Sequence, residues 1–492
     1  MYKETWQHDV ILTCRSVVGS RCGYVRAGHG ARHPESSNSF CCHPSPPERP
    51  ALSSSRQRPS RVPAVRHGQL RRSTPWISAA KIVAGALAVV LVSGASVGAY
   101  AVWDVVSSIK PSVDLGKESP PPKSIDSIEG GVNLLLVGSD SRQGQDPNLF
   151  GDPTKETGVL NDVTMLLHIS EDHSAATVVS FPRDMFVPIP SCPKPEGGNY
   201  PAMSSQKINT TLGYGGLACT VKTVEALTGL DIPYAAEVQF SGVIELSNAV
   251  GGVEVCVAKG IADPYTGTYL DAGNHNLQGL AALQFLRTRH GVGDGSDLGR
   301  ISNQQVFLSS LVRTLQSSNT LSDPTKLFSI AKAAVSNMTL STSLNDVNTM
   351  VQIALALKNI PLDQIVFVQY PNAIVDKPGH NGVEPLPGPA KTLFDAIKAD
   401  QHISLTGGTG LGSVVEPPAG ETETPATPPA GGTHTPATPP AGGTQTPAAP
   451  PAGGSSTTPT DPSAPPAVVE LPSSVTGQSA GEQTCSAGNK RK

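Results

Sequence analysis

The stretch IVAGALAVVLVSGASVGAYAV, at Ile82–Val102, contains no charged side chain and comes close to the roughly 20 residues that a bilayer requires. It predicts one transmembrane helix over residues 76–103. A cleavable signal peptide is the first alternative, but it would start near residue 1, whereas about 80 residues precede this stretch. That objection weakens if Met1 is not the true start. A buried helix of a soluble core is the second alternative, which the length of the run and its flanking charges disfavour.

The balance of basic and acidic residues changes just before this apolar stretch. Residues 1–81 hold 13 Lys and Arg against 4 Asp and Glu, which leaves 23 against 36 for the remainder. Because basic flanks stay in the cytoplasm, we expect a single-pass protein of the cell membrane with its N-terminus cytoplasmic and everything after Trp103 outside. Residues 1–75 are predicted to be a basic, disordered arm, and residues 104–127 an extracytoplasmic linker.

The cysteines agree with this topology. Those of the arm match no zinc pattern, and thiols stay reduced in the cytoplasm. Cys192 follows a predicted strand and Cys219 begins a predicted helix in the exported body, so we prefer a Cys192–Cys219 disulfide. Cys256 alternates inside VEVCVA as a small buried hydrophobe does. Cys485 falls in the tail.

The C-terminal part of the chain repeats an 11-residue unit, which reads TPATPPAGGTH and then TPATPPAGGTQ from Thr424 onward. Such a sequence offers almost nothing to bury, and it adopts polyproline II conformation in part. Residues 406–492 are therefore predicted to be a disordered, Pro/Thr/Gly-rich tail that acts as a spacer.

Residues 128–405 alternate between strand and helix patterns. VNLLLVG (132–138) is an apolar run that ends in glycine, which is typical of a buried strand. VTMLLHIS (163–170) and ATVVSFP (176–182) flank a polar turn and predict a hairpin. An α/β fold follows, with a central mixed sheet flanked by helices on both faces. Further strands are expected at 234–239, 253–258 and 365–370, and helices at 204–229, 241–252, 277–286, 298–316, 324–337 and 343–358.

Polar side chains cluster where the predicted strands stop, and such strand ends form the ligand crevice of open α/β sheets. Guanidinium groups bind phosphate oxygens bidentately and keep their charge. Several arginines with a pair of carboxylates therefore predict a site for a pyrophosphate and a divalent metal. The residues concerned are Asp140, Arg142, Asp162, Arg183, Asp184, Arg287, Arg289, Asp297, Arg300 and Gln304.

Asp140 and Asp162 are the predicted metal ligands. Mg²⁺ typically takes one or two carboxylates and completes its shell with water and phosphate oxygens, and Mn²⁺ is a possible substitute. Each aspartate also has a simpler interpretation, because Asp140 could stabilise a turn and Asp162 could open the hairpin as an Asx turn.

The other candidates have structural interpretations too. Asp297 stands where a helix cap belongs, and Arg300 and Gln304 share a face near the positive end of that helix, which favours an anion. Any single arginine could form a solvated surface ion pair. His290 is interpreted as a loop residue, and Lys207 as a residue behind the site.

Seven motifs in order resemble the LytR-CpsA-Psr family in its actinobacterial form, over about 130–315: LLLVGSDSR, NDVTMLLHIS, VVSFPRD, KINTTLGYGG, TVEALTGLDI, GVIELSNAVGGVEV and LRTRHGVGDGSDLGRISNQQ. The resemblance implies a catalytic domain of α-β-α type over 128–405. It also implies a Mg²⁺-dependent phosphotransferase of cell-wall biogenesis, which moves a glycopolymer from a polyprenyl-pyrophosphate carrier to peptidoglycan. The expected partners are that lipid-linked glycan, peptidoglycan and the membrane.

The resemblance carries site roles over position by position. The metal-binding carboxylates fall on Asp140 and Asp162. The pyrophosphate is expected to be bound by Arg142, Arg183, Arg287, Arg289, Arg300 and Gln304, with catalytic roles for Asp140, Arg183, Arg287, Arg289, Asp297 and Arg300.

Further expectations concern the reaction and two departures from the family pattern. Asp140 or Asp297 would accept the proton of the attacking hydroxyl. The helices at 204–229 and 241–250 would line an apolar slot for the polyprenyl chain. This chain has Leu160 and Asn303 where the family commonly has arginine, which puts a phosphate contact in doubt.

Other functions use the same crevice. A non-catalytic protein that binds the lipid-linked glycan, and a pyrophosphatase that uses water as the acceptor, remain the alternatives. The basic arm would attract DNA, but it contains no helix-turn-helix pattern, so no nucleic-acid partner is expected.

Overall fold

The computed structural model describes residues 75–107, 111–116, 131–194, 196–317, 320, 323–415 and 468–489. The predictions for the arm, for most of the linker and for the 11-residue repeats lie outside these residues. The apolar stretch forms helix α1 (Pro75–Ser107), and its segment Trp76–Tyr100 is long and apolar enough to cross a membrane. No part of its most apolar window is buried.

A seven-stranded mixed sheet forms the centre of the domain, as the sequence predicts. Strand β1 (Val132–Ser139) runs antiparallel to β2 (Asn161–Ile169) and parallel to β8 (Tyr234–Val238). Strand β3 (Ala176–Phe181) continues antiparallel from β2, which confirms the predicted hairpin. The order across the sheet is β13, β8, β1, β2, β3, β14, β20, with β13 at Met338–Leu340, β14 at Ile365–Gln369 and β20 at Gly477–Ser479.

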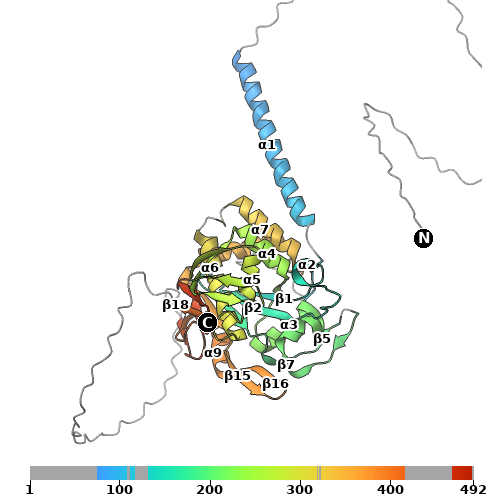
Figure 1. Cartoon of the computed structure of the whole chain (residues 1–492). Coiled ribbons are helices and arrows are strands. Elements are labelled where there is room, and N and C mark those ends of the chain that lie inside the picture. Colours follow the sequence, from blue (N-terminus) through green and yellow to red (C-terminus); the bar gives the residue numbers. More distant parts are fainter. Residues whose placement is uncertain are drawn as a thin grey trace, which may run out of the picture. The chain divides into compact units, whose positions relative to one another are not determined.

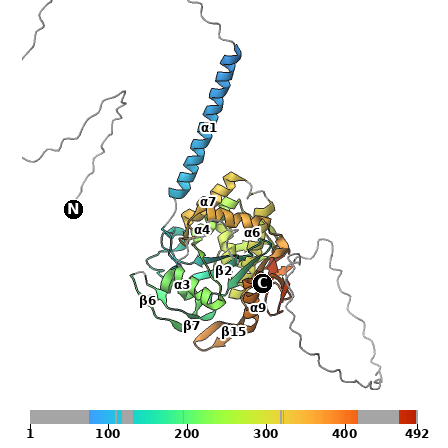
Figure 2. The ribbon, with the colours of Figure 1, turned by 180° about the vertical axis from the view of Figure 1, so that it is seen from behind.

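Helices cover both faces of this sheet because successive side chains of a strand point to opposite faces. Leu135 of β1 packs in one core cluster with Val221 and Leu393. Leu134 packs in a second cluster with Val335. The first face carries α3 (Thr211–Thr228) and α9 (Pro387–Lys398), and the second carries α4 (Phe240–Val250), α6 (Asp297–Ser317), α7 (Pro324–Asn337) and α8 (Val347–Asn359). Helix α5 (Leu280–Arg287) packs against α4 and α6. In Figures 1 and 2, α4, α6 and α7 lie together in the upper part of the domain, and α3 and α9 lie in its lower part.

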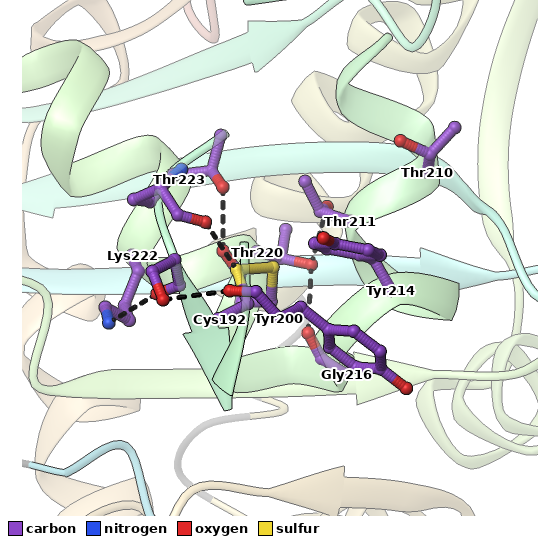
Figure 3. Close-up of a disulfide and its surroundings, with 12 residues drawn as sticks. Cys192, Tyr200, Thr210, Thr211, Tyr214, Gly216, Thr220, Lys222 and Thr223 are labelled. Atoms are coloured by element: carbon purple, nitrogen blue, oxygen red, sulfur yellow. Dashed lines mark hydrogen bonds between the residues drawn. A yellow bond between two sulfur atoms is a disulfide. The ribbon is translucent and has the colours of Figure 1, made fainter. Parts of the chain in front are cut away.

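The part of α3 just after its kink is fastened by the Cys192–Cys219 disulfide, which confirms the preferred pairing (Figure 3). The Cα atoms of the two cysteines lie 5.1 Å apart. A Cβ atom at Gly215 would lie 2.8 Å from the Cβ atoms of both cysteines, so the kink of the helix beside the disulfide requires glycine. Beside it, the hydroxyls of Thr211 and Thr220 form a 2.9 Å hydrogen bond inside the domain.

The predicted helix over 204–229 is wrong at its beginning. Residues Met203–Lys207 form strand β7, which pairs with β4 (Phe186–Ile189). The short segment follows its strand partner rather than its own propensity, because pairing and packing decide the structure of short strands.

Residues 468–489 return to the domain, so the predicted disordered tail over 406–492 is wrong for them and for 406–415. Strand β21 (Thr484–Ala487) lies between β9 (Val253–Lys259) and β18 (Ser413–Val415), and the coloured C-terminal segment of Figure 1 lies beside β18. Cys485 forms a disulfide with Cys256, which is therefore not an unpaired hydrophobe. The partners lie 229 residues apart, so local spacing gave no sign of the bond.

The remaining elements are short or lie outside the central sheet. They are α2 (Pro147–Phe150), β5 (Cys192–Pro193), β6 (Asn199–Tyr200), β10 (Ile261–Asp263), β11 (Thr268–Leu270), β12 (Gly273–Leu277), β15 (Asn372–Lys377), β16 (His380–Pro385), β17 (His402–Leu405), β19 (Val468–Leu471) and the 3₁₀ turns Ile208–Thr210 and Leu362–Gln364.

Replacing Cys256 and Cys485 together by serine is expected to lower the free energy of unfolding by about 2–5 kcal/mol, because the bond restricts a long loop of the unfolded chain. Denaturant unfolding followed by circular dichroism measures the change. The control is the same double replacement at Cys192 and Cys219, whose separation is 27 residues and whose loss should be smaller. A larger loss for the control pair would contradict this loop-length argument.

Candidate functional site

The predicted site residues of the first three strands meet at one edge of the sheet, because the end of β1 and the end of β3 both lie beside the start of β2. Asp162 and Arg183 form an ion pair there. Asp140 is held by the backbone of Leu160, whose N–H donates to Asp140 Oδ1 at 2.7 Å and whose carbonyl accepts from the Asp140 N–H at 3.1 Å. Leu160 thus fixes Asp140 through its backbone N–H and carbonyl, which any residue except proline would provide at this position.

Asp297 gathers three of the predicted arginines. Its Oδ1 lies 2.7 Å from Nη2 of Arg300, 3.6 Å from Nη2 of Arg289 and 3.7 Å from Nε of Arg183. The Asp297 side chain is 10% exposed, so these charges interact in surroundings with little water. Electrostatic attraction is stronger there than in bulk solvent.

Asp297 does not cap helix α6. Ser296 takes that place, because its Oγ accepts the N–H of Gly299 at 3.2 Å while its carbonyl accepts the N–H of Arg300 at 3.3 Å. Asp294 accepts the N–H of Ser296 at 2.9 Å in a local turn. Of the two loop aspartates, Asp297 is therefore the one that faces the arginines.

A second carboxylate, Asp184, links Lys207 to this group. Lys207 Nζ donates to Asp184 Oδ1 at 2.9 Å, and Oδ2 lies 3.5 Å from Arg183 Nε and 3.9 Å from Arg289 Nη2. Burial alone would raise the pKa of Asp184, but the hydrogen bond from Lys207 and the charges of the two arginines outweigh it and lower that pKa. Lys207 lies behind the arginines, where the sequence analysis places it.

Arg142 and Arg287 converge on the ring of Phe240. Their guanidinium carbons lie 5.1 Å and 4.3 Å from the ring centroid. Arg142 also pairs with Glu156 at 3.1 Å. Within the part of the chain that the structure describes, no carboxylate lies within 4.0 Å ion-pair distance of Arg287. Arg287 is therefore a cation held by an aromatic ring and left available for an anion.

Two of the arginines, Arg287 and Arg289, lie in surroundings that disfavour their positive charge. Burial lowers the pKa of Arg287, and the nearby charges of Arg142 and Arg300 lower it further. Burial likewise lowers the pKa of Arg289, with added repulsion from Arg183 and Arg300 that nearby carboxylates only partly offset. Bringing in an anion with several negative charges would relieve this repulsion.

Two side-chain amides of α6 hold the helix end that carries Arg287. Asn303 Nδ2 donates to the carbonyl of Phe285 at 2.9 Å, and Gln304 Nε2 donates to that of Leu286 at 3.0 Å. Carbonyls at a helix end lack helical partners, so these two bonds satisfy groups that would otherwise be unpaired. Asn303 is fully buried, which explains how this chain uses a position where the family commonly has arginine.

An apolar cavity of about 130 Å³ lies beside the arginines, between the sheet and helices α4, α5 and α6. Helix α4 lines it as expected. The expectation for α3 is wrong, because the apolar side chains of α3 pack on the opposite face of the sheet. The cavity is lined by Leu136, Met165, Phe240, Val243, Leu283, Leu286 and Leu308 among others, and its charged and polar residues are Ser139, Asp162, Gln239, Arg287, Arg300 and Gln304.

Asp263 is a buried carboxylate that the sequence analysis missed. Its Oδ2 accepts the Thr288 hydroxyl at 2.7 Å, the Arg289 N–H at 3.0 Å and the His290 N–H at 3.2 Å, and its Oδ1 accepts the Tyr265 N–H at 3.1 Å. It therefore fixes the backbone that presents Arg289. Only the folded structure brings this carboxylate to that turn, and no local sequence motif indicated its role.

Asp140 and Asp162 fit a divalent cation in charge. Burial raises the pKa of Asp140; the N–H of Leu160 opposes this shift, and the negative charge of Asp162 adds to it. Within the described residues no group of three or more His, Cys, Asp or Glu could hold a metal. Two carboxylates completed by water and phosphate oxygens are nevertheless typical of Mg²⁺, so the pair suits a cation that binds together with a phosphate.

The comparisons with known proteins agree with this picture of the domain. The LytR_cpsA_psr family model matches residues 104–395, well over half of the chain. The chain belongs to the LytR-CpsA-Psr family. This confirms the resemblance on which the sequence analysis relied, and the mixed sheet with helices on both faces is the fold that the resemblance implied.

Three relatives illustrate the range of similarity. Cell wall biosynthesis protein LcpA of Corynebacterium glutamicum is 31% identical over 278 residues, which cover 52% of each chain. The probable cell wall biosynthesis protein LcpB of that organism is 35% identical over 232 residues, covering 46% of this chain and 52% of LcpB. The chain thus spans about half the length of both. Polyisoprenyl-teichoic acid–peptidoglycan teichoic acid transferase TagT of Bacillus subtilis is 27% identical over 315 residues, covering 62% and 89%.

Solved structures with a similar backbone trace include "TagT bound to LI-WTA". It has 20% sequence identity and a TM-score of 0.43, and the match covers 58% of this chain and 98% of the TagT chain. A LytR-Csp2A-Psr enzyme from Actinomyces oris also has 20% identity and a TM-score of 0.43, covering 59% and 96%. Structural similarity at these identities and TM-scores supports no statement about function.

An Asp263→Asn variant is expected to lower the melting temperature at pH 7, because hydrogen bonds to a buried charge contribute about 2 kcal/mol. Burial raises the pKa of Asp263, but the bonds from Thr288, Arg289 and Tyr265 and the charge of His290 outweigh it and lower that pKa. A lowered pKa stabilises the fold above the ordinary value of about 4, and this stability is lost as the pH falls through the folded-state pKa.

The two proteins should therefore converge in melting temperature as the pH falls below about 4. Asp376→Asn, at an exposed position of strand β15, is the control and should match the parent protein throughout. A difference between Asp263→Asn and the parent that stays constant down to pH 3 would contradict the assignment.

Proposed function

We propose that this protein is a membrane-anchored phosphotransferase outside the cell membrane, which transfers a glycopolymer from a polyprenyl-pyrophosphate carrier to peptidoglycan. The observation that carries the proposal is the position of Arg287. It is a half-buried cation without a carboxylate partner among the described residues, and it lies where the arginine cluster meets the apolar cavity. A ligand with a doubly charged head and an apolar chain matches both halves of this site.

Membership of the family supports the chemical class. TagT is named as a transferase of polyisoprenyl-linked teichoic acid to peptidoglycan, and LcpA as a protein of cell wall biosynthesis. Helix α1 supports the anchoring, because it has the length and composition of a membrane span. With the basic arm in the cytoplasm, the domain would face the envelope side, where a membrane-bound carrier is within reach.

The reaction is a phosphoryl transfer. A sugar hydroxyl of peptidoglycan attacks the phosphorus that bears the glycan, a new P–O bond forms, and the P–O bond to the bridging oxygen breaks so that polyprenyl phosphate leaves. Arg183, Arg289 and Arg300 are in place to neutralise the charge that develops on the phosphate oxygens. Positioning and charge neutralisation supply most of the catalysis in such reactions, so a strong base is not required.

Asp140 is the better of the two candidates for accepting the hydroxyl proton. Its Oδ1 accepts the N–H of Leu160, and within the described residues no arginine or lysine lies within ion-pair distance of its carboxylate. Asp297 instead faces three guanidiniums, and this contact suits it to hold the arginines in place. Asp140 and Asp162 would hold Mg²⁺, which when bound supplies neutralisation of the pyrophosphate charge.

An Asp162→Ala variant is expected to abolish Mg²⁺-dependent transfer, because both the metal site and the partner of Arg183 are lost, while circular dichroism stays unchanged. The assay incubates the full chain with a polyprenyl-pyrophosphate-linked glycan, Mg²⁺ and peptidoglycan fragments, and follows products by mass spectrometry. The control is Asp152→Ala, an exposed carboxylate between β1 and β2, which should retain full activity.

Three outcomes of this assay separate the candidate functions. Polyprenyl phosphate together with a glycosylated fragment supports the transferase. Polyprenyl phosphate with free glycan phosphate would indicate a pyrophosphatase, and lipid binding without any product a non-catalytic binding protein. Unchanged transfer by Asp162→Ala would remove Asp162 from the site.

A Val243→Phe variant tests the apolar cavity as the slot for the lipid. The larger ring should fill space beside Phe240 and raise the KM about ten-fold for a long-chain carrier, but much less for a carrier with two isoprene units, since each buried CH₂ contributes about 0.8 kcal/mol. Leu246→Phe on the same helix, whose side chain does not line the cavity, is the control. Equal effects of Val243→Phe on both carriers would contradict the assignment.

A further inference from the structure

We infer that the C-terminal strand β21 and the two residues after it are a positioning element of the active site, although they lie far from its motifs in sequence. They hold the turn that presents Arg289 and the helix end that presents Arg287. The effect expected on transfer kinetics rests on the proposed function. The effect expected on the structure of the loop rests only on the contacts of the folded chain.

The first contact joins β21 to the end of helix α5. The Ser486 hydroxyl donates a short hydrogen bond to Oδ1 of Asn303, whose Nδ2 donates to the carbonyl of Phe285 at 2.9 Å. Ser486 and Asn303 are both fully buried, so no water can take the place of either partner. Phe285 is two residues before Arg287, and the chain of bonds therefore runs from β21 to that arginine through one amide group.

The second contact joins β21 to the loop after Arg289. The N–H of Gly293 donates to the carbonyl of Ala487 at 2.8 Å, and the N–H of Asn489 donates to the carbonyl of Gly291 at 2.9 Å. The side chain of Asn489 adds a 3.3 Å bond to the carbonyl of Val292. The loop is thus paired with the C-terminal segment on one side, while Asp263 holds its beginning.

Close backbone packing fixes the position of the segment. A Cβ atom at Gly488 would lie 1.9 Å from the carbonyl oxygen of Lys259, so a side chain there would push the end of β21 away from the loop. Gly412, next to β18, would similarly place a Cβ atom 1.9 Å from the carbonyl oxygen of Gly299 in the first turn of α6. The Cys256–Cys485 bond fastens β21 in this register.

The test compares two pairs of matched variants of the full chain. Ser486→Ala removes the bond to Asn303. Its control, Ser479→Ala, removes a hydroxyl of strand β20 whose one hydrogen bond among the described residues is to the exposed N–H of Glu482. Gly488→Ala displaces the end of β21, and its control, Gly408→Ala, adds a methyl group where no atom lies within 4 Å.

Hydrogen exchange is the first readout, and it does not depend on turnover. Ser486→Ala and Gly488→Ala should accelerate amide exchange over 286–293, whereas the controls should leave it unchanged. Exchange that matches the controls in both variants would overturn the inference, whatever the protein catalyses.

Transfer kinetics are the second readout. Loss of one buried hydrogen bond should raise the KM for the lipid-pyrophosphate carrier about five-fold in Ser486→Ala. A purely structural role would lower only the active fraction, and hence the apparent kcat, with KM unchanged. If the parent protein shows no turnover, the proposed function fails while the exchange result still decides the positioning role.

Discussion

The contact between Asp297 and the guanidiniums of Arg183, Arg289 and Arg300 is the interaction on which the site depends. It joins the end of β3 to the loop after α5 and the first turn of α6, which lie far from β3 in the sequence. Three like charges within reach of one carboxylate would repel one another in a dry site. Asp297, Asp184 and Asp162 reduce that repulsion enough for the arginines to converge, although the pKa of Arg289 is still lowered by burial and by its neighbours Arg183 and Arg300.

The supports of this cluster are backbone groups, buried amides and one further carboxylate, Asp263. Asp263 holds the turn before Arg289, Asn303 and Gln304 hold the helix end at Arg287, and Leu160 holds Asp140. Such supports restrict the arginines without consuming their donors. Under the proposed function, the apolar cavity beside them would take the hydrocarbon chain of the same ligand, which is why we propose a lipid pyrophosphate rather than a soluble one.

The sequence predicted the parts of this structure that depend on local pattern. The apolar runs at β1, β2 and β3 indicated buried strands, and the polar residues after them indicated one ligand-binding edge. The motif around Arg287, Arg289 and Arg300 carried enough information to place these residues together. The Cys192–Cys219 bond also followed from neighbouring elements.

What the sequence did not predict depends on contacts between distant segments. Strand β7 lacks an apolar alternation and exists because β4 pairs with it. The role of Asp263 appears only when the turn at Thr288 folds over it. Cys485 follows a Pro-rich segment that resembles a spacer, so its bond to Cys256 and the return of β21 to the domain could not be read from composition.

The most direct measurement of the central claim is calorimetric binding of geranyl pyrophosphate and geranyl phosphate to the full chain with Mg²⁺, in the parent protein and in Arg287→Gln. The account predicts that the pyrophosphate binds at least ten-fold more tightly than the monophosphate, since a further charged contact contributes about 1.5–3 kcal/mol, and that Arg287→Gln removes most of this preference. Equal affinity for the two lipids, or a preference that survives Arg287→Gln, would contradict it.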